Sequence, residues 1–157
     1  MKSIFSPIII LLTGYLIMTC QNINKSDLPS DLKIEVVAGG LHPWEENYYL
    51  LINVNGNCKY SKFIPGDIGA PPIEEKEFLI KEQDLINIWR CISINEFFSM
   101  ESEYKKGNII GGFYARLTIA ANKHSHIVRV ENTVPEKIDS IITSINKLLP
   151  EGLTLTL

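Results

Sequence analysis

The chain has 157 residues, of which 45% are hydrophobic and 21% charged, and its formal net charge is −3 at pH 7. This length fits one domain, and the apolar content is high enough to build a core, which excludes disorder over most of the chain. Lys and Arg number 15 against 18 Asp and Glu, so no nucleic-acid partner is expected, and 3 Cys are too few for a disulfide-stapled mini-protein.

The N-terminal segment has the pattern of an export signal. Met1 and Lys2 give a short positive start, and Ile8–Met18 is an apolar run of 11 residues. A membrane-spanning helix needs about 20 apolar residues, so this run is too short for a stable span, but it has the length of the apolar part of a signal peptide. We therefore expect residues 1–19 to be a signal peptide.

The junction at Cys20 indicates the fate of the chain after export. Ile17, Met18 and Thr19 precede Cys20, and a polar stretch follows it. This arrangement resembles the lipobox of bacterial lipoproteins, although Thr19 stands where that family carries Gly, Ala or Ser. The resemblance implies that Cys20 becomes the first mature residue and carries a diacylglycerol on its thiol. The chain would then be tethered to a membrane of the bacterial cell envelope, facing the periplasm or the cell surface. The alternative is an ordinary signal peptide with an incidental Cys, or a short uncleaved anchor.

The rest of the chain divides into a tether and one domain. Residues 20–31 are predicted to be the lipidated Cys and a flexible tether, because they are polar and show no apolar period. Residues 32–157 are predicted to form a single folded domain. Residues 21–157 contain 14 basic and 18 acidic residues, a formal net charge of −4, which slightly repels an anionic lipid surface. We therefore expect the anchor, rather than a face of the domain, to hold the protein at the membrane.

The first half of the domain is predicted to be mostly strands. Alternating apolar residues predict strands over residues 32–36 and 47–54, and the turn at Asn55-Gly56-Asn57 predicts a hairpin with a returning strand over 58–63. A three-residue loop would place Val54 opposite Cys58. Residues 64–76 contain three Pro and two Gly, which predicts an irregular connection, and residues 78–80 suit a short strand or the approach to a helix.

The second half of the domain is predicted to contain both helices. Apolar residues at helical spacing predict one helix over residues 82–94 and a second from Pro135 to Pro150. Between the two helices we expect a polar loop over 101–111, followed by strands over 112–120 and 124–131. The alternating stretch 153–157 suits an edge strand. The order β-β-β-α-β-β-α-β, with hairpins rather than crossovers, predicts an α+β domain with a mainly antiparallel sheet and two helices on one face.

A second resemblance covers residues 32–149. A tyrosine-bearing strand runs into the Asn-Gly turn, a helix ends near NEFFSMESEY (95–104), a Gly-led strand spans 111–119, and a last helix follows Pro135. This order resembles a group of small bacterial lipoproteins known as a domain of unknown function. The resemblance implies an envelope protein without an assigned activity.

The most suggestive chemical pattern is His124-Ser125-His126. Two residues apart on a strand, both imidazoles point to the same side and can meet one metal ion, with His42, Glu45 or Glu46 as a third ligand by residue type. The alternative is that both histidines belong to the polar outer face of a hairpin strand.

Two cysteines remain once Cys20 is assigned to the lipid. An exported location would let Cys58 and Cys91 form a disulfide; the alternative is two buried free thiols. A catalytic Cys–His pair is disfavoured, because Cys91 lies late in its helix, at the end whose dipole does not lower the pKa of a thiol.

Other polar and aromatic groups favour no catalytic chemistry. Glu74, Glu75 and Glu77 suit a solvated surface, and Trp44 and the tyrosines that follow it suit either a partner or sugar surface or the core. The sequence therefore favours a lipid-anchored, non-enzymatic envelope module, without a cofactor, that binds an envelope partner or has a structural role. The alternative is an envelope hydrolase or metal-binding protein with a dispersed site.

Overall fold

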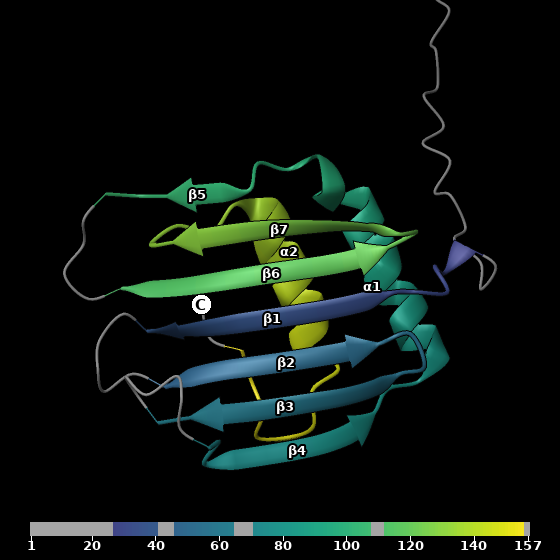
Figure 1. The fold of residues 1–157 in the computed structure, drawn as a ribbon, viewed down its shortest axis with the longest axis horizontal. Helices are drawn as coiled ribbons and strands as arrows, with labels where there is room; N and C mark the ends of the chain where they lie inside the picture. The colour runs from purple at the N-terminus through teal and green to yellow at the C-terminus, as the bar shows by residue number, and fades with distance from the viewer. Residues whose placement is uncertain (1–26, 41–45, 65–70, 108–111, 156–157) are drawn as a thin grey trace, which may run out of the picture.

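The computed structural model describes residues 27–40, 46–64, 71–107 and 112–155, and every structural statement below concerns this part of the chain (Figure 1). The strands form a single sheet. They are β1 (Lys33–Gly40), β2 (Asn47–Asn53), β3 (Asn57–Phe63), β4 (Glu74–Leu79), β5 (Glu103–Lys105), β6 (Phe113–Ala121) and β7 (His124–Glu131). The helices are α1 (Glu82–Ile94), the short 3-10 helix η2 (Phe97–Ser99) and α2 (Glu136–Asn146).

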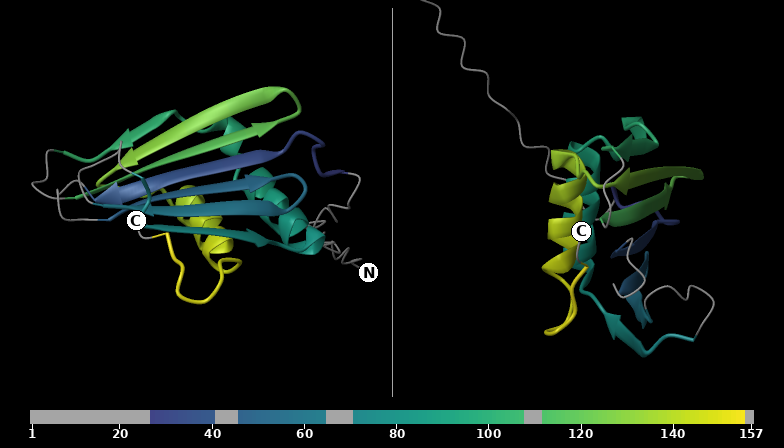
Figure 2. Two further views of the ribbon diagram at one scale, coloured as in Figure 1. Left: turned by 60° about the horizontal axis from the view of Figure 1, so that its bottom comes forward. Right: turned by 90° about the vertical axis from the view of Figure 1, so that its left-hand side faces the viewer.

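The sheet has seven strands in the order β4-β3-β2-β1-β6-β7-β5. All neighbouring strands are antiparallel except β5, which lies parallel to β7. Figure 2 shows α1 and α2 on the same side of the sheet. The predicted α+β class, the mainly antiparallel sheet and the two helices on one face are therefore confirmed.

The hydrophobic core lies between the sheet and the two helices. Alternate residues of each central strand point into it, as the period of two in a strand requires. Ile34, Val36 and Leu50 are fully buried on the strand side, and Ile92 and Ile141 on the helix side. Helix α1 begins and ends where the apolar spacing predicts, at Glu82 and Ile94.

The β2–β3 hairpin is correctly placed, but the predicted register is wrong by two residues. Ile52 lies opposite Cys58, where Val54 was expected. The loop consists of residues 54–56, and Gly56 closes it with a φ of 81°, a left-handed conformation that glycine adopts without strain. Because the shift is two residues, every side chain stays on its predicted face.

Four parts of the chain differ from the sequence prediction. The irregular connection expected over 64–76 is too long, because β4 begins at Glu74, and the loop expected over 101–111 contains β5. The described end of the chain does not form the expected edge strand. Helix α2 ends at Asn146 rather than near Pro150, and the Asn146 side chain holds the backbone of Leu155 with hydrogen bonds of 2.8 and 3.0 Å, which keep that residue in the core.

Candidate functional site

The face of the sheet opposite the helices carries the candidate site. No helix of the described residues covers this face (Figure 2). Strand pairing aligns one row of side chains across it, called here the central row. Its members, from β2 to β5, are Tyr49, Val37, Arg116, Arg129 and Glu103. Since side chains directly opposite one another lie within contact range, the row places the two guanidinium groups next to each other.

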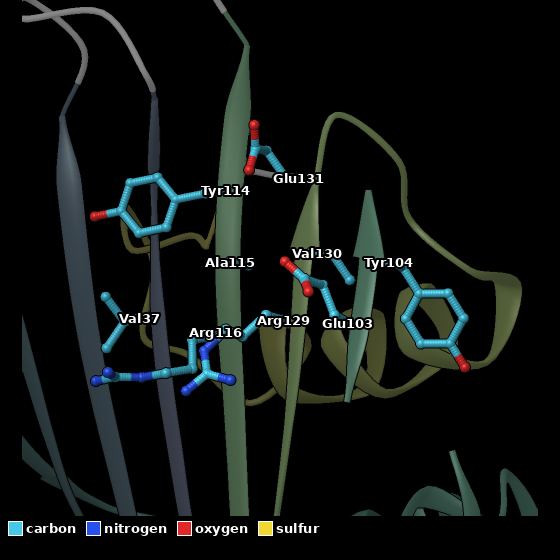
Figure 3. A pocket seen from close by; sticks show the side chains of 9 residues that line it. All are labelled: Val37, Glu103, Tyr104, Tyr114, Ala115, Arg116, Arg129, Val130 and Glu131. Atoms are coloured by element: carbon cyan, nitrogen blue, oxygen red, sulfur yellow. The ribbon is translucent and has the colours of Figure 1, made fainter. Parts of the chain in front are cut away.

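Arg116 and Arg129 form an unusual pair. They are directly opposite on β6 and β7 and are two of the three arginines in the chain. Like charges in this position destabilise a sheet. Within the described part of the chain, neither guanidinium makes an ion pair or a hydrogen bond with a neighbour. In Figure 3 both side chains extend toward β1, away from the carboxylate of Glu103. The pair therefore presents two unneutralised positive charges on the same side.

A shallow groove surrounds this pair, called here the arginine groove. One hollow of about 440 Å³ lies around the two arginines, Tyr114, Glu103 and Glu131 (Figure 3). A second hollow of about 180 Å³ continues from it across β1 and β2, and Val37, Tyr114 and Arg116 line both. The second hollow is also lined by Asn47, Tyr48, Tyr49 and Phe63. The groove is thus cationic over β6 and β7 and aromatic over β1 to β3.

Gly39 shapes the floor of the aromatic part. Because Gly39 has no side chain, the Asn47 side chain lies across β1; a Cβ at Gly39 would overlap Asn47 Oδ1 and lie 3.0 Å from its Cγ. Asn47 is only 8% exposed, and its Oδ1 accepts a hydrogen bond of 3.1 Å from the Tyr114 hydroxyl. Burial raises the pKa of Tyr114, so this hydroxyl stays neutral and remains a donor. This contact fixes the ring of Tyr114 at the edge of the groove.

The far side of the groove is acidic. Glu131 makes a 2.8 Å ion pair with Lys105, and Glu103 lies beside Arg129 in the central row without an ion pair to any described residue. On the other side of the central row, Glu35 is paired with Lys33. The positive charge of the groove is therefore confined to the two arginines and is bordered by carboxylates.

The two candidate histidines of β7 have separate surroundings in the structure. His126 packs its ring edge-to-face against Phe97 with centroids 5.4 Å apart, and its Nε2 lies 2.9 Å from the carbonyl oxygen of Met100. His124 is exposed at the start of β7. Of the residues that are third ligands by type only, Glu46 precedes β2 at the opposite end of the sheet, where it is 2.6 Å from Lys62 Nζ. His42 and Glu45 lie outside the described residues, and the described residues contain no group of three metal-binding side chains.

Cys58 and Cys91 are both free, so the structure has the free thiols and not the possible disulfide between them. Cys58 is buried on β3, where burial raises the pKa of its thiol to about 11, so it is a poor nucleophile. Cys91 lies on α1 and faces α2, where its sulfur is 3.6 Å from the carbonyl oxygen of Ser140 and 3.3 Å from Ser144 Oγ. The two thiols occupy different environments, each satisfied locally.

The remaining aromatic and acidic candidates lie at the groove and at the sheet edge. Tyr48 packs against Tyr60 with centroids 6.1 Å apart and donates a 2.6 Å hydrogen bond to Glu46, and both Tyr48 and Tyr49 line the second hollow of the arginine groove. Trp44 lies outside the described residues. Two glutamates of β4 form ion pairs at the sheet edge, Glu75 with Lys59 and Glu74 with Lys76, both at 2.9 Å, as expected for a solvated surface.

Sequence reasoning missed Arg116 and Arg129, although a signal for them was present. The β6–β7 turn consists of Asn122 and Lys123, both with positive φ, as a two-residue type I′ hairpin turn requires. Counting back from this turn places the two arginines directly opposite each other. The strand bounds expected from the sequence, 112–120 and 124–131, leave three residues for the turn, and such a turn shifts the pairing by one residue, so that the two arginines are no longer opposite.

Cys20 lies outside the described residues, so its lipidation stays a prediction. Neither α1 nor α2 nor any other helix in the described ranges is long and apolar enough to cross a membrane. The chain matches no protein-family model, and no curated protein matches it significantly.

Proposed function

We propose that this chain is a lipid-anchored protein of the bacterial cell envelope whose domain binds a ligand through the arginine groove and is not an enzyme. The observation that supports this best is the Arg116–Arg129 pair on a sheet face that no described helix covers. Two like charges held opposite each other cost stability, and such a local conflict is typical of a functional site.

The composition of the groove favours binding over catalysis. Its described lining contains Arg, Glu, Tyr, Asn, Val, Ala and Phe, but no Cys, Ser or His. A nucleophile with an adjacent base, the usual arrangement for covalent hydrolysis, is therefore not found among these residues. Exposed arginines and tyrosines are instead the side chains that contribute most to recognition.

The proposed anchor rests on the signal segment that ends at Cys20. Each acyl CH₂ that enters a bilayer contributes ~0.8 kcal/mol, so two or three acyl chains would hold the domain at a membrane. We expect Cys20→Ser to abolish labelled fatty-acid incorporation and partitioning into the detergent phase. Cys91→Ser serves as the matched control and should leave both unchanged. Fatty-acid labelling that persists in the Cys20 variant would refute the anchor.

The binding role is tested in the native envelope by photo-crosslinking. A photoreactive residue at Val37, inside the groove, should give specific adducts that disappear when Arg116 and Arg129 are replaced by Gln. The same residue at Gln83, exposed on α1 in the helix layer, should not give these adducts. Adducts from Val37 that do not depend on the arginines would refute binding through the groove.

A further inference from the structure

We infer that the arginine groove binds a phosphomonoester whose remaining part is apolar or aromatic. This inference rests on the proposed function, because it names the ligand of the same groove. It follows from the charge, the direction and the surroundings of Arg116 and Arg129.

The two guanidinium groups supply the two positive charges that a dianion needs, and they point away from Glu103, which also lines the hollow (Figure 3). Two guanidinium groups lie side by side without an anionic partner among the described residues, while Glu131 is already neutralised by Lys105. A phosphomonoester carries a charge of about −1.5 to −2 at pH 7 and three strong acceptor oxygens. A single carboxylate carries one charge and would leave one arginine unmatched. Planar guanidinium forks also suit the several oxygens of one phosphate group.

The direction of the arginines places the rest of the ligand. Both guanidinium groups extend toward β1, where Val37 and Tyr114 line the boundary between the cationic hollow and the aromatic one (Figure 3). A phosphate held between the arginines would therefore have its substituent over Tyr49 and Phe63. An apolar or aromatic substituent buries apolar surface there, whereas a strongly hydrated one gains little.

The acidic border limits the ligand to one phosphate. Glu103 lies next to Arg129 in the central row, and Glu35 and Glu131 occupy the rows on either side. A polyanion such as a nucleic acid would place further negative charges against these carboxylates, and the chain as a whole is also negatively charged. A ligand with a single terminal phosphate avoids this repulsion.

The test is a calorimetric titration of the purified full chain in detergent with phenyl phosphate, inorganic phosphate, benzoate and phenol. We expect phenyl phosphate to bind more tightly than inorganic phosphate and at least tenfold more tightly than benzoate, and phenol not to bind measurably. Arg116→Gln and Arg129→Gln should each weaken phenyl phosphate at least tenfold. Lys147→Gln, an exposed charge loss after α2, is the matched control and should not change binding.

Three further readouts separate a binding role from a structural one. Affinity should fall below pH 6, where a phosphomonoester loses its second charge. Arg116→Gln should leave the urea midpoint unchanged or raise it, because it relieves a like-charge contact. Tyr49→Ser should remove the preference for phenyl phosphate over inorganic phosphate.

Each contrary result has a definite meaning. Benzoate binding as tightly as phenyl phosphate, or phenyl phosphate binding that ignores both arginines, overturns the phosphate assignment. If phenyl phosphate fails while arginine-dependent adducts from Val37 persist, the inference is wrong and the proposed binding face stands. If both fail, the proposed function fails with it.

Discussion

Replacing Gly39 with Ala tests the account of the groove floor. Gly39 does not have a positive φ, so an alanine backbone is compatible with its position. The added Cβ would overlap Asn47 Oδ1 and lie 3.2 Å from Asn47 Cα. The Asn47 side chain must then move, and its hydrogen bond with the Tyr114 hydroxyl is lost.

The expected loss of unfolding free energy is about 2–4 kcal/mol. Losing the Tyr114–Asn47 hydrogen bond accounts for about 1 kcal/mol, and overpacking a closely filled site adds about 1–3 kcal/mol. Tyr114→Phe removes only the hydrogen bond and should cost about 1 kcal/mol. The difference between the two variants therefore measures the steric contribution.

Urea denaturation of the four members of a double-mutant cycle with Asn47→Ala provides the assay. Without the Asn47 side-chain amide, only the 3.2 Å contact with the Asn47 Cα remains at position 39, and Gly39→Ala should cost less than about 1 kcal/mol. If the full cost persists in the Asn47→Ala background, or if Gly39→Ala alone costs less than about 1 kcal/mol, the Asn47 side chain does not exclude a Cβ at position 39.

Three further predictions concern stability outside the groove. The Asp31 carboxylate accepts hydrogen bonds of 2.7 Å from both backbone amides of the β6–β7 turn, and these bonds lower the pKa of Asp31. The stabilisation that they provide is present above pH 3.8 and is lost as the pH falls through the lowered pKa. The urea midpoints of wild type and Asp31→Asn should therefore converge in acid, and a difference that does not depend on pH would contradict this. Burial raises the pKa of Cys58 from 9.0 to about 11 and the pKa of Tyr60 from 10.0 to about 12. The free energy of unfolding should therefore be retained below pH 9 and fall above it by at most about 1.4 kcal/mol per pH unit for each group. A urea midpoint that stays constant up to pH 11 would contradict this. Asn146→Ala removes two hydrogen bonds to the backbone of Leu155 and should lower the free energy of unfolding by about 1–3 kcal/mol. Limited proteolysis should also release the C-terminal peptide faster, and an unchanged digestion pattern would contradict the role of Asn146 in holding Leu155.

The elements that could be predicted are those with a strong local signal. Both ends of helix α1 were predicted correctly, because its apolar residues recur every three to four positions and bury Leu85, Ile88 and Ile92. The central strands β1, β2, β6 and β7 alternate between core and surface, so their faces could also be assigned. Since these elements form most of the core, they determine the fold class.

The elements that could not be predicted depend on distant partners. Strand β4 lies at the sheet edge and is largely exposed, so its charged sequence Glu74–Glu77 lacks the alternation of a half-buried strand. Strand β5 has only three residues and exists because β7 offers an edge for Glu103–Lys105 to pair with. Neither strand has a local pattern that distinguishes it from a loop.

The candidate site could not be predicted for a related reason. Arg116 and Arg129 are separated by a turn, and each one alone is an ordinary exposed strand residue. Their chemistry arises only from being directly opposite, which a shift of one residue in the hairpin register would remove. The pair of histidines at 124 and 126, by contrast, is easily noticed in the sequence. In the structure, His126 only makes local contacts, with its ring packed against Phe97.

The central position of β1 has a consequence for how the protein folds. Strand β1 pairs on one side with β2, the next strand in the chain, and on the other side with β6, where Val36 lies opposite the sequence-distant Leu117. Until the β6–β7 hairpin arrives, β1 presents a bare row of backbone donors and acceptors, which is a template for aggregation. Closing so long a loop is entropically costly, and non-local pairings of this kind slow folding. We therefore expect docking of this hairpin on β1 to limit the folding rate, and the unpaired edge of β1 to be the part of the nascent domain that most needs protection.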